Sequence, residues 1–314
     1  MTIKSFPRPR AADNYDPPAA SRGLVSLNSL GTSTASTLSI VVCSYNQAPF
    51  IREALESLVN QQDLRPGELE IIVIDGGSTD GSAEIIREYA THFAYVVSEP
   101  DRGQTHALKK GFAHATGDIL GWLCSDDVLE VDTVRFVLDY FREHLEVDFM
   151  YGDARVIGAM GELLKMKKEI PFSWFIWKYD YNYIPQTSAF WRRTLYEQVK
   201  GLDETFDLCM DGDLWARFAE RTWPRHVRRM LSKVRSYPQT KTDRLVKLSL
   251  EEHRRVCLRY GTGPANVLCA RALRLLAKLW RVSWKLVTGC YPRIISDRRP
   301  AGRRCLTGEG SKQP

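Results

Sequence analysis

The chain has no Cys-x-x-Cys pair, although it contains seven cysteines among 314 residues. These cysteines are scattered and odd in number, which argues against a disulfide framework and against a structural zinc site. Residues 1–36 also lack an apolar segment of the kind that a secretory signal needs. We therefore expect a cytoplasmic protein whose thiols are reduced.

Positive charge is scarce in the central part of the sequence. Residues 37–263 carry 29 Lys and Arg against 34 Asp and Glu, whereas residues 264–314 carry 11 against 2. A nucleic-acid enzyme would place its basic patch on the folded domain, so we expect no nucleic-acid partner. The length and the 44% share of hydrophobic residues suit one catalytic domain with two tails.

The sequence does contain a repeated pattern of strand, loop and helix. β-branched runs at 38–46 and 69–75 each precede polar residues and a helical apolar period. A third unit joins residues 94–97 to a helix around 107–112, and a fourth apolar run follows at 119–124. This alternation predicts an α/β fold with a mostly parallel sheet, on which ligands bind beyond the carboxyl ends of the strands.

Polar residues stand at the ends of these strands. Asp126 and Asp127 end the fourth run, and Asn46, Asp75 and Asp101 follow the other three. Two adjacent carboxylates repel each other, and a divalent cation such as Mg²⁺ or Mn²⁺ relieves that repulsion while leaving positions for phosphate oxygens. An isolated Asp pair more often caps a turn, but four polar strand ends at one edge predict phosphate-ester chemistry.

Several segments resemble family 2 of the nucleotide-sugar glycosyltransferases. In the order and spacing of that family, they are Val41–Asn46, Ile74–Gly81, Gly103–Gln104, Ser125–Asp127, Ile184–Arg193 and Met210–Arg217. The last two are similar to acceptor-side segments of the bacterial surface-polysaccharide, or O-antigen, branch. The resemblance covers about residues 37–260. It implies a GT-A fold, with a catalytic domain at 37–263 in which 37–128 bind the nucleotide and 129–263 shape the acceptor pocket.

The resemblance also implies roles for individual residues. Asp126 would hold the metal, Asp127 would share it or bind the ribose, and Asp211 would be the catalytic base of an inverting transfer. The other residues implied at the donor nucleotide are Ser44, Tyr45, Asn46, Asp75, Ser78, Asp101, Gln104 and Lys110, and those at the acceptor or sugar pocket are Gln186, Trp191, Arg192 and Asp213. For Lys110 a solvated helix lysine is the alternative, and for Asp101 a turn cap.

Two features leave alternatives open. Cys124 stands where many family members carry an Asp, so the Asp-x-Asp pattern is incomplete and the metal requirement stays open. The aromatic segment 172–183 predicts either an acceptor platform or core packing.

The two ends of the chain differ from its centre. Residues 1–36 and 291–314 are expected to be flexible tails, and residues 244–260 form a predicted helix that ends before Gly261. Residues 264–290 interleave Trp and Leu with Arg and Lys, which predicts a basic amphipathic helix on the cytoplasmic face of an anionic inner membrane. Packing on the core or on a second subunit is the alternative, so the oligomeric state stays open.

We therefore predict an inverting hexosyltransferase that moves a sugar from a nucleoside diphosphate sugar, expected to be a UDP-sugar, to a hydroxyl of a glycan or lipid-linked glycan. One alternative is a nucleotidyltransferase that makes nucleotide sugars. It would need a Gly-rich basic loop after the first strand, which residues 44–49 lack. The other is a catalytically inactive sugar- or nucleotide-binding scaffold, which would have no use for a base at Asp211.

Overall fold

The computed structural model describes residues 36–238, 240–241, 245–260 and 267–290, so the predicted tails lie almost wholly outside the described residues. The strands are β1 (Leu38–Ser44), β2 (Leu69–Asp75), β3 (Tyr95–Ser98), β4 (Ile119–Cys124), β5 (Val128–Leu129), β6 (Phe149–Ile157), β7 (Leu163–Lys167), β8 (Ala189–Arg192) and β9 (Arg225–Arg235). The helices include α1 (Ile51–Val59), α2 (Ser82–Glu88), α3 (Gln104–His114), α4 (Thr133–Glu143), α5 (Trp174–Tyr179), α6 (Arg193–Gln198), α7 (Met210–Ala219), α9 (Val246–Arg259) and α10 (Val267–Val287). Short 3₁₀ turns, η1 (Ala90–His92) and η2 (Gln186–Ser188), complete the element order.

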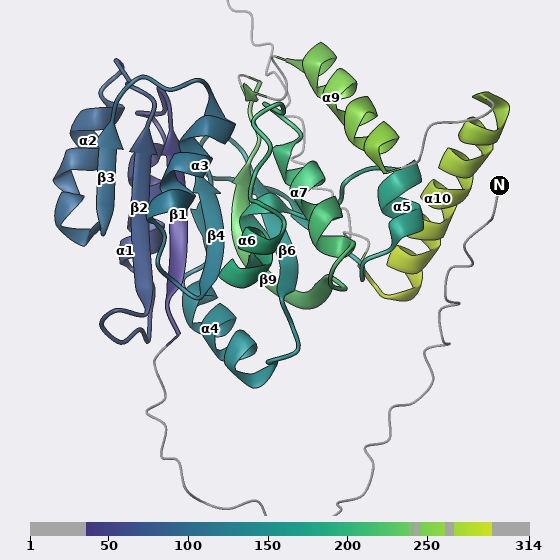
Figure 1. Ribbon diagram of the computed structural model, residues 1–314, viewed down its shortest axis with the longest axis horizontal. Helices are drawn as coiled ribbons and strands as arrows, with labels where there is room; N and C mark the ends of the chain where they lie inside the picture. Colours follow the sequence, from purple (N-terminus) through teal and green to yellow (C-terminus); the bar gives the residue numbers. More distant parts are fainter. Residues whose placement is uncertain (1–35, 239, 242–244, 261–266, 291–314) are drawn as a thin grey trace, which may run out of the picture. The chain divides into compact units, whose positions relative to one another are not determined.

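All of these strands join one mixed sheet in the order β3-β2-β1-β4-β8-β6-β9-β5, with β7 paired to β6 (Figure 1). The first four are parallel, as the alternating pattern predicts. Their register places Ser44 beside Asp75, and Cys43 beside Cys124. The polar residues that follow these strands therefore start from one edge of the sheet.

The second half of the sheet departs from the predicted parallel arrangement. β8 pairs antiparallel with both β4 and β6, and β9 pairs parallel with β6 and antiparallel with β5. β6 returns directly into β7 through residues 158–162, without a crossover helix. The antiparallel β6–β7 pair needs only a short turn, whereas α5, α6 and α7 separate β7, β8 and β9.

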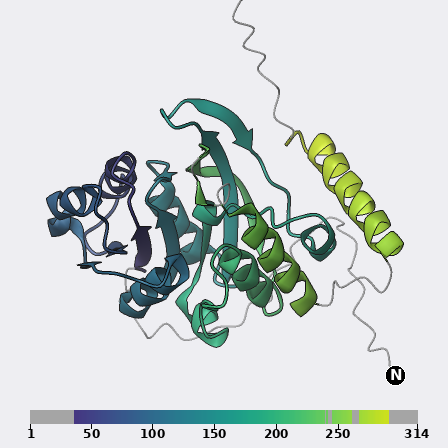
Figure 2. The same cartoon turned by 90° about the horizontal axis from the view of Figure 1, so that it is seen from above.

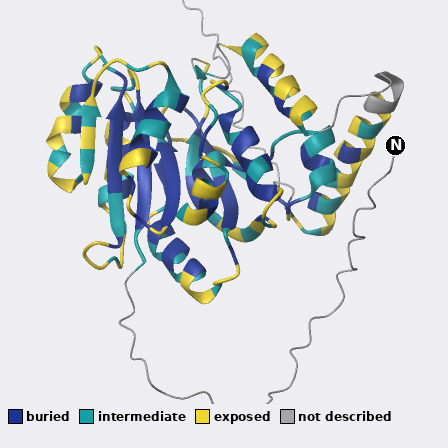
Figure 3. Ribbon diagram, viewed as in Figure 1, coloured by how far each residue is buried: buried dark blue, intermediate teal, exposed yellow. Residues whose placement is uncertain are grey.

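Helices cover both faces of the sheet (Figures 1 and 2). Apolar residues of α1, α2 and α4 pack on one face, and those of α3, α5 and α7 pack on the other. α3 approaches β1 closely at Gly111, where an added Cβ would lie 2.3 Å from Val41 Cγ1. Every residue of β1 is buried, as expected for a strand covered on both faces (Figure 3).

The predicted aromatic segment belongs mainly to the core. Phe172, Trp177 and Tyr183 are buried, whereas Tyr181 is partly exposed and reaches the cavity described below. A second aromatic cluster joins the strands to α7, since the Trp215 ring lies 5.5 Å from that of Trp122 and 5.2 Å from that of Trp191. Most of these rings pack against one another rather than forming an open sugar-stacking surface.

The two C-terminal helices fall within the predicted segments. α10 packs through buried Ala277, through an ion pair between Arg281 and Asp180, and through a second ion pair between Lys285 and Glu169. Most of its remaining surface is exposed (Figure 3). Within the described ranges, none of the helices has the length and apolar content to cross a membrane.

Candidate active site

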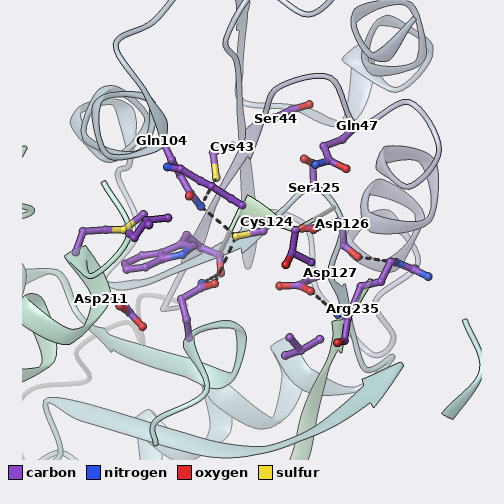
Figure 4. Close-up of a pocket in the computed structure, with 18 of the residues that line it drawn as sticks. Cys43, Ser44, Gln47, Gln104, Cys124, Ser125, Asp126, Asp127, Asp211 and Arg235 are labelled. Carbon is purple, nitrogen blue, oxygen red and sulfur yellow. Dashed lines mark hydrogen bonds between the residues drawn. The ribbon is translucent and has the colours of Figure 1, made fainter. Parts of the chain in front are cut away.

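A cavity of about 1250 Å³ opens at the carboxyl ends of the parallel strands (Figure 4). Its walls combine residues that are distant in sequence, from β1, β4, β7, β9, α7 and α10. The predicted site residues that line it are Ser44, Tyr45, Asp101, Gln104, Asp126, Asp127, Gln186 and Asp211. The cavity therefore gathers the predicted metal pair and the predicted base into one space.

Strand β9 holds the two adjacent carboxylates in place. The backbone N–H of Arg235 donates to Asp127 Oδ1 at 2.8 Å, and Arg235 Nε donates to the backbone carbonyl of Asp126 at 2.8 Å. Tyr237 Oη donates to Asp126 Oδ2 at 3.0 Å. Figure 4 shows Asp126 and Asp127 beside Arg235 on one wall of the cavity. These contacts give the carboxylates a fixed orientation toward the cavity.

The carboxylate pair is electrostatically unfavourable without a cation. Burial raises the pKa of Asp126, and burial together with the neighbouring Asp126 charge raises the pKa of Asp127 well above its ordinary value. One ligand atom from each of Cys124, Asp126 and Asp127 lies within 4.8 Å of the others. The Cys43 contact and burial raise the pKa of the Cys124 thiol well above its ordinary value, so this thiol stays protonated and is a poor ligand. The two carboxylates fit an oxygen-preferring divalent ion that takes its other ligands from phosphate and water.

Two thiols lie beside this pair. Cys43 and Cys124 are neighbours across β1 and β4, and Gln104 Nε2 lies 3.5 Å from Cys43 Sγ and 3.3 Å from Cys124 Sγ. Gln186 Nε2 donates to the backbone carbonyl of Trp122 at 2.8 Å. Gln104 and Gln186 therefore form part of the cavity floor through contacts with β1 and β4.

The wall next to β1 and β2 is suited to a flat ring. Tyr45 is 62% exposed and lines the cavity. A Cβ added at Gly76 would lie 2.7 Å from Asp101 Oδ2 and 3.3 Å from the Tyr45 ring, so a larger residue there would displace the Asp101 carboxylate. Ser44 Oγ is buried, lines the cavity and has no hydrogen-bond partner among the described residues. A ligand in the cavity could satisfy that hydroxyl.

Three of the residues that were predicted to bind the nucleotide form hydrogen bonds within and around the loop 76–81. Asp75 is fully buried and accepts hydrogen bonds from Ser78 N, Ser78 Oγ and Ser98 Oγ. Asn46 has a φ of +52°, and its Oδ1 accepts from Thr79 N. None of Asn46, Asp75 and Ser78 lines the cavity. Their hydrogen bonds hold the loop 76–81 in place.

Asp211 lies near the start of α7 on another part of the cavity wall (Figure 4). Asn182 Nδ2 donates to Asp211 Oδ2 at 3.0 Å, and the backbone N–H of Gly212 donates to Oδ1 at 2.6 Å. Burial raises the pKa of Asp211 to about 6, an increase that these two hydrogen bonds and the nearby Lys167 charge limit. A carboxylate with such a pKa is well suited to general-base catalysis near neutral pH.

Four further predicted site residues do not line the cavity. Lys110 forms an ion pair with Glu99, and Trp191 is fully buried in the aromatic cluster. Arg192 donates to the backbone carbonyls of Phe141, His144 and Val147 and so fixes the end of α4. Asp213 is fully buried between Arg217 and Arg259. The sequence does not show which of these charged residues is paired within the protein, because partners such as Arg259 for Asp213 and Phe141 for Arg192 lie about 50 residues away.

Sequence reasoning missed residues that support the predicted ones. They are Gln47, Lys167, Asn182, Arg235 and Tyr237. Asn182 stands in the aromatic segment. Arg235 ends β9, a strand that the sequence pattern did not indicate, and Tyr237 follows it. Only the polarity of Asn182 within that segment offered a signal.

The sheet, with a cavity at its parallel strand ends and a carboxylate pair on one wall, has the GT-A fold. The chain belongs to glycosyl transferase family 2, whose model matches residues 39–199, about half of the chain. An uncharacterized glycosyltransferase of Mycobacterium tuberculosis is 31% identical over 189 residues, which are 59% of this chain and 70% of the relative. Chondroitin synthase of Escherichia coli is 27% identical over 62% of this chain but only 28% of its own length.

Solved structures agree on the fold. Residues 1–349 of S. aureus TarS, crystallised with UDP, superpose with a TM-score of 0.57 at 18% identity, over 81% of this chain and 74% of that one. The mannosyltransferase PcManGT from Pyrobaculum calidifontis, in complex with GDP-Man and Mn²⁺, gives a TM-score of 0.56 at 20% identity over the same shares. These likenesses, together with the family, place the chain with glycosyltransferases rather than with nucleotidyltransferases.

Proposed function

We propose that the protein transfers a sugar from a nucleoside diphosphate sugar to a hydroxyl of a glycan or lipid-linked glycan in surface-polysaccharide synthesis, with inversion at the anomeric carbon. The observation that carries this proposal is the cavity that holds the Asp126–Asp127 pair and the partly buried Asp211 together. A UDP-sugar is the proposed donor, supported by the TarS crystals that hold UDP or UDP-GlcNAc.

The donor would occupy the wall formed by β1, β2 and β4. The exposed Tyr45 ring offers a surface for stacking the base, and the loop 76–81 fixes the position of that wall. Asp126 and Asp127 would hold a divalent cation, which when bound stabilises negative charge on the diphosphate leaving group. Tyr237 and Arg235 orient the carboxylates for that task.

The acceptor would enter from the side of α7. As the acceptor hydroxyl oxygen forms its bond to the anomeric carbon, the bond from that carbon to the donor phosphate oxygen breaks, and the hydroxyl proton passes to a carboxylate oxygen of Asp211. Asn182 is a positioning residue, since its hydrogen bond orients Asp211. A single displacement of this kind inverts the anomeric centre.

Replacement of the base tests this mechanism. We expect Asp211→Asn to lower turnover by about two orders of magnitude or more, with nucleotide binding nearly unchanged, because general-base catalysis contributes roughly 10²- to 10⁴-fold. Asp118→Asn, at an exposed position outside the cavity, is the matched control. Unchanged turnover in Asp211→Asn would remove Asp211 from this role.

A thermal-shift panel of UDP, GDP, dTDP and CDP, each with and without Mn²⁺, tests the donor site separately. A ligand that binds only the folded state raises its apparent stability. A Mn²⁺-dependent shift with UDP alone would support the proposed donor. A shift with another nucleotide would replace UDP, and no shift in folded protein would contradict a donor site at Asp126.

We also propose that α10 lies on an anionic membrane at the cytoplasmic face, where a lipid-linked acceptor would be presented. Three arcs divide its surface: a core-facing arc, a basic arc with Arg271, Arg274 and Lys278, and an exposed apolar arc. The exposed apolar arc contains Leu275, Leu276, Leu279, Trp280, Leu286 and Val287. An exposed apolar arc beside a basic one suits the headgroup region of an anionic bilayer.

A further inference from the structure

The acceptor side of the cavity carries a row of lysines on β7. Lys165, Lys167 and Lys168 all line the cavity, with Lys165 exposed and Lys167 and Lys168 partly buried. Side chains alternate along a strand, so Lys165 and Lys167 share one face of β7, about 7 Å apart along the backbone. The row therefore runs from the rim of the cavity toward its interior.

These lysines have no carboxylate partner in the part of the chain that the structure describes. No ion pair joins Lys165, Lys167 or Lys168 to an acid in these ranges, although Lys285 and Arg235 in the same cavity are paired with Glu169 and Glu53. Burial lowers the pKa of Lys167, so the protein disfavours its charge at this position. An anionic ligand would offset that cost.

The lysine row shares the cavity with the proposed base, since Lys165, Lys167 and Asp211 all line it. The Glu169 and Asp211 charges partly offset the effect of burial on the pKa of Lys167, and the Lys167 charge lowers the pKa of Asp211, as expected for opposite charges in one cavity. An anion bound at Lys165 and Lys167 would therefore lie near the acceptor hydroxyl that Asp211 deprotonates. Arg235 on β9 holds the Asp126–Asp127 pair, and β9 lies on the opposite side of β6 from β7, so the cavity has one region for a cation and another for an anion.

We infer that the acceptor carries a phosphate or diphosphate ester next to the reacting sugar, and that Lys165 and Lys167 bind that group. Lysine supplies a point charge of the kind that binds phosphate, and two lysines match the double or greater charge of a phosphate or diphosphate ester better than the single charge of a carboxylate. This inference rests on the proposed glycosyl transfer and specifies the chemical class of its acceptor. A phosphate in this position can belong to a sugar-linked acceptor or to a lipid headgroup.

Calorimetry with inorganic pyrophosphate, in EDTA and at low ionic strength, tests the anion site without the donor metal. We expect Lys165→Gln/Lys167→Gln to weaken pyrophosphate binding about tenfold or more, the loss that corresponds to about 1.4 kcal/mol. Lys247→Gln, at an exposed position on α9 outside the cavity, should leave it unchanged. Absence of pyrophosphate binding to the wild type, or equal binding to the double variant, would overturn the inference.

Transfer assays distinguish this inference from the proposed function. With a sugar diphospholipid analogue as acceptor, the double variant should raise KM, whereas an alkyl glycoside of the same sugar should show little change when both are assayed at a pH above the Asp211 limb, where its protonation does not limit the rate. UDP binding with Mn²⁺ should remain normal, which also shows that the variant is folded. If the wild type fails to bind UDP or any other nucleotide, the glycosyl-transfer proposal fails, whatever the pyrophosphate result.

Vesicle flotation separates the two phosphate sources. We expect the double variant to float with phosphatidylglycerol vesicles as well as the wild type does, because its lysines contact the acceptor inside the cavity. If the double variant loses vesicle binding while pyrophosphate binding is unchanged, these lysines bind lipid headgroups and the acceptor assignment is wrong.

Discussion

Asp211 owes its chemistry to its surroundings. Its carboxyl is buried enough to raise its pKa to about 6, yet Lys167, Asn182 and the Gly212 N–H favour the ionised form. At pH 7 most of the protein would therefore hold Asp211 as a carboxylate, with a higher basicity than an exposed aspartate has. The same lysine that we assign to the acceptor phosphate thus also tunes the base.

The rate of transfer should depend on pH through the ionisation of Asp211. Because only ionised Asp211 can accept a proton, kcat/KM should rise with pH through about 6 and then level off. Lys167→Gln removes a positive charge that lowers this pKa, so the rising limb should move to higher pH. Steady-state rates between pH 5 and 8 locate the rising limb in the wild type and in Lys167→Gln, with Lys247→Gln as the control.

An unmoved limb in Lys167→Gln would mean that this lysine does not act on Asp211. A limb that persists in Asp211→Asn, measured on the residual activity, would assign the titration to another group. The two variants together therefore distinguish the base from its neighbour.

At the scale of elements, α10 is joined to β7 and its following residues by a buried ion pair. Lys285 Nζ lies 2.7 Å from Glu169 Oε2, and Glu169 is nearly inaccessible to solvent. Replacing one member of a buried pair leaves the other charge without compensation, which costs more than removing both. The pair therefore ties the orientation of α10 to the acceptor side of the cavity.

We expect Lys285→Met to lower the free energy of unfolding by roughly 2–3 kcal/mol, because Glu169 would stay buried without its partner. The double variant Lys285→Met/Glu169→Leu should recover much of this loss. Urea denaturation of the wild type and the variants measures the difference. A double variant no more stable than Lys285→Met would show that the pair does not compensate the buried charge of Glu169.

Elements differ in how far the sequence predicts them. β1, β2 and β4 follow from apolar runs with turn residues behind them, and the helices between them follow from a regular apolar period. β8 has only four residues, and the basic residues of β9 are irregularly spaced, so neither strand has a recognisable period. The mixed strand directions in the second half of the sheet therefore could not be predicted from the sequence.

Some residues of the candidate site could be predicted from the sequence and others could not. Asp126, Asp127 and Asp211 could be named because each belongs to a short motif. Asp75 and Asn46 belong to equally short motifs, but their hydrogen bonds direct them into the loop 76–81. Arg235 and Tyr237 lie more than 100 residues from the carboxylates that they contact, and no local sequence pattern predicts contacts over such a separation.

At the scale of the whole molecule, the exposed apolar arc of α10 requires a partner surface. Isolated exposed hydrophobic residues are common, but six of them on one helix face form a continuous patch. Trp280, at 58% exposed, lies within this patch. Basic residues on the neighbouring arc favour an anionic bilayer over a neutral one.

We expect the protein to float with phosphatidylglycerol vesicles and not with phosphatidylcholine vesicles. Leu276→Glu/Trp280→Glu should abolish flotation, since it places two charges in the apolar arc, and turnover with a water-soluble acceptor should be unaffected. Leu250→Glu, on α9, is the matched control for an exposed leucine. Loss of a dimer in light scattering, without any change in flotation, would assign the arc to a second copy of the chain.

The contacts of Arg235 have a consequence for how this chain can be divided. The family match ends at residue 199, before Asp211, Arg235 and Tyr237, although the matched part contains both carboxylates that Arg235 orients. β9 also lies between β6 and β5, so the strand that completes the donor side arrives late in the chain. The proposed donor half therefore depends on residues of the acceptor half. In a chimera of two relatives joined at residue 128, the carboxylates of one parent would be held by the residues that the other parent has at positions 235 and 237.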